Sequence, residues 1–514
     1  MTAFYSPPAR IAGRQWAGLA MLALPTLLIS IDMTALALAV PALSADLRPS
    51  GVELLWITDV YGFAIAAFLV TMGTLGDRIG RRRLLLIGAA AFGLASILAA
   101  FSVSPLMLML TRAALGVAGA TLMPSTLALL RDLFTDEGQR TFAISVWMTS
   151  FLAGTALGPL VGGVMLEFFW WGSVFLIAVP VMVLLLIAGP FLLPESRSSQ
   201  NASIDAISVL QMAVSIVLLV FGIKQIAAGG DLALIGVALS AGAIMAVLFV
   251  RRQQRLDDPL LDLRLFADRV FSTAASLQMI GVFATAGVQF LLAQYLQLAL
   301  GLSPLAAGLW TLPGAIAGIV SSLSVARLVR GIRPARVLVG GLATVVIGLG
   351  LVAIGTSTAA LAVIVTGSVL MSFGFAPAMA LSAALIVNSV PAKRAGAASA
   401  VSETGGELGV ALGIAVLGSV ALGVYRTAIS TRLPDDLPPE AADAASNTIG
   451  GAFAAADGLD PQTAAALVSA AQEAFTLAQI SIVLTGAALI TALAVTVGIF
   501  LRHLPASTAT TQSL

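Results

Sequence analysis

The stretch GTLGDRIGRRR (Gly73–Arg83) lies between two apolar runs, at about 54–75 and 84–102. Each run has about 20 residues, the length that an α-helix needs to cross a hydrocarbon core about 30 Å thick. Lys and Arg accumulate in the cytoplasmic loops of membrane proteins. The stretch therefore predicts a turn between two membrane helices and places that turn on the cytoplasmic side.

The composition of the whole chain also indicates a membrane protein. Its 514 residues are 59% hydrophobic and 10% charged, whereas soluble proteins carry about 25% charged residues. The chain has no cysteine, and its single histidine, His503, follows the last apolar run. Thiol chemistry and histidine-based sites are thereby excluded, so we predict no enzyme, no metal site and no cofactor. Basic tracts interleaved with aromatic residues are absent from the sequence, which excludes a nucleic-acid partner.

Apolar runs that can span a bilayer recur along the chain and number fourteen. We therefore predict an all-α integral membrane protein with 14 transmembrane helices. Their approximate positions are 16–42, 54–75, 84–102, 106–128, 141–165, 172–193, 206–226, 232–250, 271–298, 305–326, 336–355, 359–386, 396–424 and 476–501.

The distribution of basic residues tests this count. With a cytoplasmic N-terminus, 21 of the 26 Lys and Arg residues fall in inner loops, as the positive-inside rule requires. Only Arg48, Arg426 and Arg432 fall in outer loops, and Arg112 and Lys224 lie within spans. A missed helix would reverse this bias downstream of the error. The pattern therefore favours fourteen helices with both termini in the cytoplasm.

Two weak internal matches indicate how the helices are grouped. The loop Gly73–Arg83 resembles ARLVRGIRPAR (Ala326–Arg336), and GTALGPLVGG (Gly154–Gly163) resembles GGELGVALG (Gly405–Gly413). Both matches are offset by eight helices, whereas two six-helix bundles would give an offset of six. Internal repeats of this kind are common in transporters. We therefore predict two six-helix bundles with two extra helices, the seventh and eighth, inserted between them.

The predicted division of the chain follows from this grouping. The first bundle occupies 1–200, the inserted helices and a cytoplasmic loop occupy 201–265, and the second bundle occupies 266–514. Within the second bundle, the outer segment 425–475 carries seven acids and two arginines, and apolar residues recur in it at helical spacing. Two interpretations stay open for this segment: a solvated connector, or a short hairpin that packs over the outer mouth.

Three motifs resemble those of the major facilitator superfamily. The loop Gly73–Arg83 resembles its signature loop, whose residues latch the cytoplasmic side of the two bundles. LTRAALGVAGA (Leu110–Ala120) resembles the motif with a buried arginine, here Arg112, and Gly154–Gly163 resembles the antiporter motif that is found in exporters. The positions that match the first and third motifs are Gly73, Asp77, Arg78, Gly80, Arg81, Gly154, Gly158, Pro159, Gly162 and Gly163.

Together with IDMTALALAVP (Ile31–Pro41) and LWITDVY (Leu55–Tyr61), fourteen spans resemble the drug:proton antiporters of this superfamily, in particular exporters of quaternary ammonium compounds and cationic dyes. The resemblance implies a monomer in the cytoplasmic membrane of a bacterium. Its partners would be lipophilic cations, protons and membrane lipids, with the proton gradient as energy source. Relatives that export dications carry a further acid in the tenth helix. The comparable stretch Leu312–Ser322 has none, which weakens the prediction for dications.

Charged residues inside the first bundle are candidates for the transport site. Asp32, Asp59 and Arg112 lie about 8–15 Å below the outer surface at a rise of about 1.5 Å per residue. An unpaired charge at such a depth costs about 2.5–3.5 kcal/mol or more. One arginine neutralises one aspartate, which leaves a second carboxylate to be protonated or to bind a cationic ligand. Alternatives stay open: Asp59 as a solvated lip residue, Arg112 in a structural ion pair, and Lys224 as a snorkelling residue.

A second acidic pair lies in the thirteenth span. Glu403 and Glu407 are four residues apart and share one helix face. The interleaved Gly405, Gly409 and Gly413 share another face, where small residues permit close helix contact. We predict proton exchange at the two glutamates and an Asp32 that is shared between proton and drug. Aromatic residues at candidate positions to line a substrate cavity are Tyr61, Trp147 and Trp310, although most membrane tryptophans, Trp56 included, are expected to be interfacial anchors.

These residues predict a mechanism of antiport. Burial favours the protonated form of a carboxyl group, and a lipophilic cation that enters the same site competes with the proton. We therefore predict proton-coupled export of quaternary ammonium compounds, cationic dyes and biocides by alternating access. Export of a dedicated metabolite, such as a lipid precursor, siderophore or amino acid, stays open as the alternative.

Overall fold

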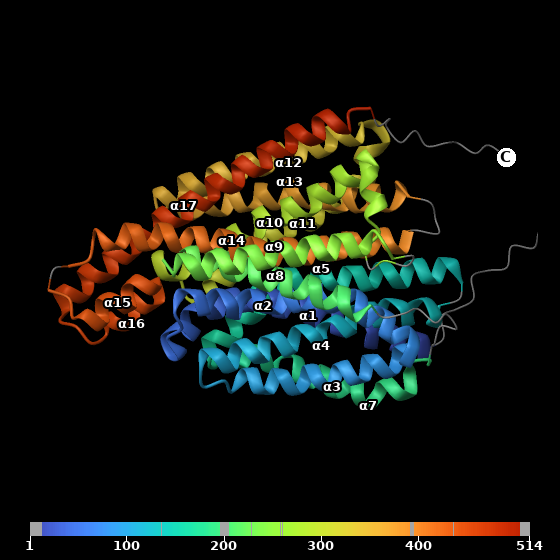
Figure 1. Cartoon of the computed structure of the whole chain (residues 1–514), viewed down its shortest axis with the longest axis horizontal. Helices are drawn as coiled ribbons and strands as arrows, with labels where there is room; N and C mark the ends of the chain where they lie inside the picture. The colour runs from blue at the N-terminus through green and yellow to red at the C-terminus, as the bar shows by residue number, and fades with distance from the viewer. Residues whose placement is uncertain are drawn as a thin grey trace, which may run out of the picture.

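The computed structural model describes residues 13–134, 136–195, 205–227, 229–256, 259, 261–390, 395–434 and 436–503. All regular elements in these ranges are helices, which run roughly along the long axis of the molecule (Figure 1). Fourteen spans are long and apolar enough to cross a membrane, which confirms the predicted count. Two of them consist of consecutive helices, α6 with α7 and α10 with η2. The predicted positions of both chain termini lie outside the described residues.

The helices begin and end as follows: α1 Gly13–Leu47, α2 Gly51–Ile79, α3 Arg81–Ala100, α4 Pro105–Leu133, α5 Glu137–Phe168, α6 Ser173–Leu176, α7 Ala178–Leu192, α8 Ala206–Ala227, α9 Leu232–Gln253, η1 Leu263–Ala267, α10 Arg269–Gln294, η2 Tyr295–Ala299, α11 Pro304–Gly331, α12 Pro334–Ser357, α13 Leu361–Asn388, α14 Ala395–Ser430, α15 Pro439–Asn447, α16 Ile449–Ala456 and α17 Pro461–Phe500.

Local sequence explains both ends of α2, the second of which lies in the signature loop. The α2 helix begins with a capping box, in which the Ser50 side chain accepts from the Glu53 backbone N–H and the Glu53 carboxylate accepts from the Ser50 N–H. It ends at Gly80, which has a φ of 108° and also precedes the first residue of α3. A residue with a side chain is strained at this φ. The glycine therefore allows two membrane helices to follow one another with a single residue between them.

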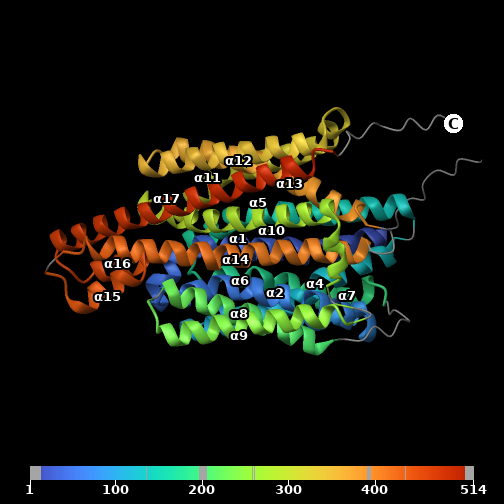
Figure 2. The same cartoon turned by 45° about the horizontal axis from the view of Figure 1, so that its top comes forward.

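The helices form two bundles with a further pair against their side. In the first bundle, α1 packs on α5, α2 on α4 and α3 on α7, and in the second, α10 packs on α14, α11 on α13 and α12 on both α13 and α17. The inserted helix α8 contacts α2 of one bundle and α14 of the other, and α9 packs on α8 (Figure 2). The structure thus has the two six-helix bundles and the extra helix pair that the sequence predicted.

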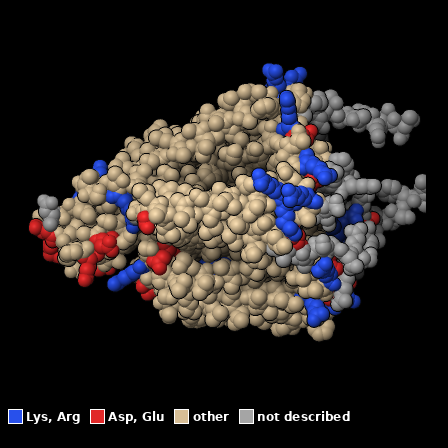
Figure 3. Space-filling view, viewed as in Figure 1, with Lys and Arg blue, Asp and Glu red and all other residues tan. Residues whose placement is uncertain are grey.

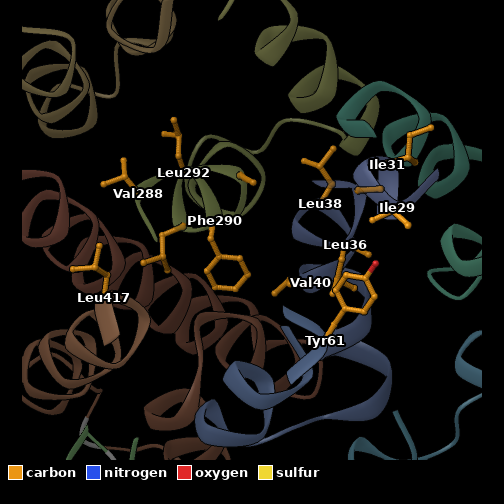
Figure 4. Packing of buried hydrophobic residues seen from close by; sticks show 14 of the residues in the cluster. Ile29, Ile31, Leu36, Leu38, Val40, Tyr61, Val288, Phe290, Leu292 and Leu417 are labelled. Carbon is orange, nitrogen blue, oxygen red and sulfur yellow. The ribbon is translucent and has the colours of Figure 1, made fainter. Parts of the chain in front are cut away.

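The two bundles close against each other in the half of the molecule that contains the α1–α2 connection. Figure 4 shows this packing, with Val288, Phe290 and Leu292 of α10 and Leu417 of α14 on one side and residues of α1 and α2 on the other. A cross-bundle hydrogen bond reinforces it, because Gln297 Nε2 donates to the Leu38 carbonyl at 3.2 Å.

The charged side chains separate between the two ends of the molecule. In Figure 3, Lys and Arg gather at one end, and Asp and Glu gather at the opposite end over α15 and α16. We call these the basic end and the acidic end. The segment between α14 and α17 forms the helices α15 and α16, and α16 contacts α1 of the first bundle. These contacts agree with the interpretation of segment 425–475 as a packed hairpin and not as a solvated connector. The α17 helix begins at Pro461, earlier than the predicted span.

Candidate transport site

Asp32 and Arg112 form a buried ion pair between α1 and α4. Arg112 Nη1 lies 2.7 Å from Asp32 Oδ2, and the two residues are 1% and 8% exposed. Arg112 Nε also donates to the Ile57 carbonyl at 3.3 Å, and its guanidinium lies 4.4 Å from the centre of the Tyr61 ring. The arginine is thus held by three helices and compensates one carboxylate completely. These contacts match the interpretation of Arg112 as an ion-pair partner.

Asp59 on α2 forms a second buried ion pair, with Lys224 from the inserted helix α8. Lys224 Nζ lies 2.9 Å from Asp59 Oδ2 and donates to Oδ1 at 3.0 Å, and both side chains are fully buried. The interpretation of Lys224 as a snorkelling residue is wrong, and so is that of Asp59 as a solvated lip residue. The expectation that one aspartate of the first bundle lacks a protein cation is wrong for the same reason. Lys224 comes from the inserted helix α8, so a comparison of the charged residues within the first bundle did not include it.

Glu403 and Glu407 lie on one face of α14, as their spacing predicts. Glu407 is 7% exposed, and its Oε2 atom has no hydrogen-bond partner. Glu403 is partly buried one turn away, near enough to interact electrostatically with Glu407. Within the described part of the chain, neither glutamate forms an ion pair with Lys or Arg. The two acids of the second bundle thus differ from those of the first in having no cation.

Tyr61 lies on α2, the helix of the first bundle that packs on α14, which carries Glu403 and Glu407. Its ring stacks on the Arg112 guanidinium. The Tyr61 hydroxyl is buried and lacks a hydrogen-bond partner, as does Glu407 Oε2. Unpaired buried polar atoms are costly, so a hydrogen-bonding ligand at either atom, or a proton at the carboxylate, would be stabilised.

Glycines on α14 allow this helix to approach α10 closely. A Cβ added at Gly409 would lie 2.7 Å from the Met279 carbonyl oxygen, and one at Gly413 would collide with the Phe283 backbone, both on α10. Gly405 has open space instead. Gly409 and Gly413 therefore fulfil the predicted close contact and Gly405 does not.

The glycine motif of α5 fixes the position of α1 around Asp32. A Cβ at Gly154 would collide with Ser30 and Leu27, one at Gly158 with Thr34, and one at Gly162 would lie 2.9 Å from the Ala35 Cβ. Glycine at these three positions lets α5 approach α1 closely on both sides of the aspartate.

The same motif also reaches the other bundle, because a Cβ at Gly163 would lie 2.8 Å from the Pro304 carbonyl oxygen of α11. A Cβ at Gly308 of α11 would in turn collide with Pro159. Gly163 and Pro159 thus lie directly in the contact between the two bundles.

The signature loop lies at the basic end. Asp77 Oδ1 lies 2.6 Å from Arg81 Nη2 across Gly80, so the carboxylate pairs within its own bundle. A Cβ at Gly73 would lie 3.8 Å from Pro124 of α4. Arg78 lies in the last turn of α2.

The three candidate aromatic residues have different surroundings. Tyr61 is buried beneath the Arg112 guanidinium, as described above. Trp147 is buried and donates from Nε1 to Thr126 Oγ1 at 3.1 Å, which ties α5 to α4. Trp310 on α11 is 44% exposed. The sequence also missed Trp56, predicted as an anchor, whose ring centre lies 3.7 Å from Lys224 Nζ.

A family model described as Major Facilitator Superfamily matches residues 22–414 of the chain. The chain belongs to this superfamily. A solved structure of a bacterial homologue of the human lysosomal transporter Spinster, in an inward-facing and unoccupied conformation, has a similar fold. The TM-score is 0.64 at 14% identity, and the match covers 96% of this chain and 99% of that one.

The sequence relatives have names that refer to drug efflux, drug resistance or export. The multidrug efflux pump LfrA of Mycolicibacterium smegmatis is 43% identical over 96% of this chain and 98% of its own length. The methyl viologen resistance protein SmvA of Salmonella typhimurium is 36% identical over 90% and 93%, and the tetracenomycin C resistance and export protein of Streptomyces glaucescens is 32% identical over 91% and 84%. The protein is thus a multi-pass inner-membrane transporter and a drug exporter, and it is no enzyme.

Proposed function

We propose that this transporter is a proton-coupled antiporter that exports lipophilic cations such as quaternary ammonium compounds, cationic dyes and biocides. The observation that carries the proposal is the buried carboxyl group of Glu407, whose Oε2 atom has no hydrogen-bond partner and which forms no ion pair with Lys or Arg within the described part of the chain. A carboxylate without a counter-cation is stabilised either by a proton or by a cationic substrate. Because one group serves both, binding of the substrate releases the proton.

The charge state of the first bundle supports this assignment. Asp32 and Asp59 are each compensated by a protein cation, so neither requires a proton or a substrate for charge balance. Glu407, with Glu403 one turn away, is where an added positive charge is stabilised most.

Alternating access follows from the way in which the bundles meet. Contacts such as Gly163 with Pro304 and Gln297 with Leu38 close the acidic half of the molecule. We propose that the basic end and both chain termini lie in the cytoplasm, so that this state takes up substrate there. The protein would act as a monomer surrounded by lipid, with Asp77 and Arg81 in the latch that closes the cytoplasmic side in the opposite state.

The energy available depends on the proton count. One proton exchanged for one monovalent cation moves no net charge, and only the pH gradient drives export, at about 1.4 kcal/mol per pH unit. A second proton adds about 2.3 kcal/mol per 100 mV of membrane potential. Glu403 and Glu407 together provide two sites for such protons.

A test of the proposal is substrate-induced proton release from the purified transporter in detergent. Addition of tetraphenylphosphonium, a lipophilic monocation, should acidify an unbuffered solution of the wild type and leave a solution of Glu407→Gln unchanged. Dye uptake into inverted vesicles should be abolished by a protonophore. Uptake that persists with the protonophore would refute proton coupling. The alternative, export of a dedicated metabolite, is suggested by the tetracenomycin C relative and predicts binding of one neutral or anionic compound without competition from lipophilic cations.

A further inference from the structure

The ammonium group of Lys224 lies in a small buried site built by α2. On one side is the Asp59 carboxylate, with oxygens 2.9 and 3.0 Å from Nζ. On another side is the face of the Trp56 indole, whose ring centre is 3.7 Å from Nζ. Lys224 is 0% exposed and Asp59 is 1% exposed. A carboxylate and an indole face around an ammonium group are the elements of a recognition site for organic cations.

Packing of the inserted helix places Lys224 in this site. Ile216, Val220 and Lys224 are four residues apart and share one face of α8. Val220 is 0% exposed and packs with Phe63 of α2 and Ala411 of α14, and Ile216 and Trp56 pack against the same cluster. This packing therefore places the side chain of Lys224 where the two bundles meet.

The helix α9 packs on α8 from the other side. Ser215 Oγ donates to the Gly242 carbonyl at 2.9 Å, and a Cβ at Gly222 would lie 2.6 Å from Leu239. Together these contacts fix the rotation of α8 about its axis, and with it the direction of the lysine.

We propose that Trp56 and Asp59 form a second organic-cation site, and that the chain fills it with its own Lys224 and thereby sets the charge of the substrates that the pump accepts. The proposal rests on the proposed function and extends it. A tethered ligand competes with free ligands at a high effective concentration, so Lys224 excludes other cations from this site. With Asp59 neutralised, Glu403 and Glu407 are the acids left for substrate and protons.

A purely structural ion pair is the competing interpretation, and the two differ in what they predict. A structural pair loses stability when Lys224 is shortened and does not respond to an added amine. A cation site emptied in Lys224→Ala instead gains an internal vacancy that n-propylammonium matches in length and charge, because alanine keeps the Cβ atom and three carbons and the ammonium group are lost. In the double variant Asp59→Asn/Lys224→Ala the vacancy remains but its carboxylate is lost.

The first test is chemical rescue, measured as the thermal unfolding midpoint of the purified full-length protein in detergent. We expect n-propylammonium chloride to raise the midpoint of Lys224→Ala by about 1 °C, the shift that about 1 kcal/mol of binding gives for a chain of 514 residues. The wild type, the double variant and the neutral analogue n-propanol are the controls and should show no such rise. Absence of rescue in Lys224→Ala, or equal rescue in the double variant, would overturn the proposal.

The second test measures substrate charge with Lys224→Met, which keeps the volume of the side chain. Binding of tetraphenylphosphonium, a monocation, and of methyl viologen, a dication, is measured by calorimetry in detergent. We expect Lys224→Met to increase the affinity for methyl viologen relative to that for tetraphenylphosphonium by about tenfold, which corresponds to about 1.4 kcal/mol. Asp59→Asn/Lys224→Met should return this ratio of affinities to the wild-type value. An unchanged ratio in Lys224→Met overturns this inference alone, whereas a wild type that binds neither cation overturns the proposed function.

Discussion

The two bundles differ in whether their buried acids are paired with a protein cation. In the first bundle, Asp32 is paired with Arg112 and Asp59 with Lys224, and all four residues are at most 8% exposed. In the second, Glu407 is equally buried, and within the described residues it forms no ion pair with Lys or Arg. A compensated carboxylate holds its charge in every state, whereas an uncompensated one changes its charge state readily. The difference separates acids that shape the site from acids that exchange protons.

The largest effect is expected at Glu407. Glu407→Gln removes the uncompensated charge but keeps the side-chain volume, so substrate-induced proton release should be lost completely while the protein folds normally. Glu403→Gln is the matched control one turn away and should reduce the number of released protons without abolishing release. Calorimetry in two buffers of different ionisation enthalpy measures the count. Equal losses in both variants would remove the distinction between the two glutamates.

A large effect on stability is expected when one half of a first-bundle pair is removed. Arg112→Met leaves Asp32 as a buried charge without a partner, which costs about 3–5 kcal/mol. Asp32→Asn/Arg112→Met removes both charges and should recover most of that stability while transport stays impaired. Thermal unfolding with a transport assay on the same samples measures both. Full transport by the double variant would show that this pair has only a structural role.

An intermediate effect is expected from the close contact of α14 with α10. Gly413→Ala forces a methyl group into the Phe283 backbone of α10, and overpacking of this kind costs about 1–3 kcal/mol. Gly405→Ala on the same face of α14 meets open space and should be neutral or stabilising by about 0.5–1 kcal/mol. Thermal unfolding compares the two variants. Similar midpoints would contradict the close contact between α10 and α14.

The sequence predicted the features that depend on local pattern. Apolar runs predicted fourteen spans, the offset of the repeats predicted the two inserted helices, and spacing predicted the common face of Glu403 and Glu407. The partner of Asp59 could not be predicted, because Lys224 lies 165 residues away on a helix outside the bundle. Its orientation depends on the rotation of α8, which packing against α2, α14 and α9 fixes. The available signal for this ion pair was that Lys224, like Arg112, lies within a predicted span. Its position near a helix end favoured the snorkelling interpretation instead.

The smallest effect is expected at the other end of α8, where Asp205 pairs with Arg252 of α9. Arg252 Nη2 lies 2.8 Å from Asp205 Oδ1, and the Ser208 hydroxyl also donates to Asp205. The hydrogen bonds from Arg252 lower the pKa of Asp205 from 3.8 to about 2. The stability that this pair contributes is therefore fully present above pH 3.8 and is lost as the pH falls toward 2.

Asp205→Asn should lower stability at neutral pH by about 0–1 kcal/mol, because the pair is partly exposed, and should have no effect near pH 2. If α8 and α9 hold Lys224 against Asp59 through their own packing, the charge selectivity of Asp205→Asn will equal that of the wild type. A shift toward dications in this variant would instead show that the pair at this end of α8 is needed to keep Lys224 in its site. Binding of methyl viologen and tetraphenylphosphonium, compared in the same detergent, distinguishes the two outcomes.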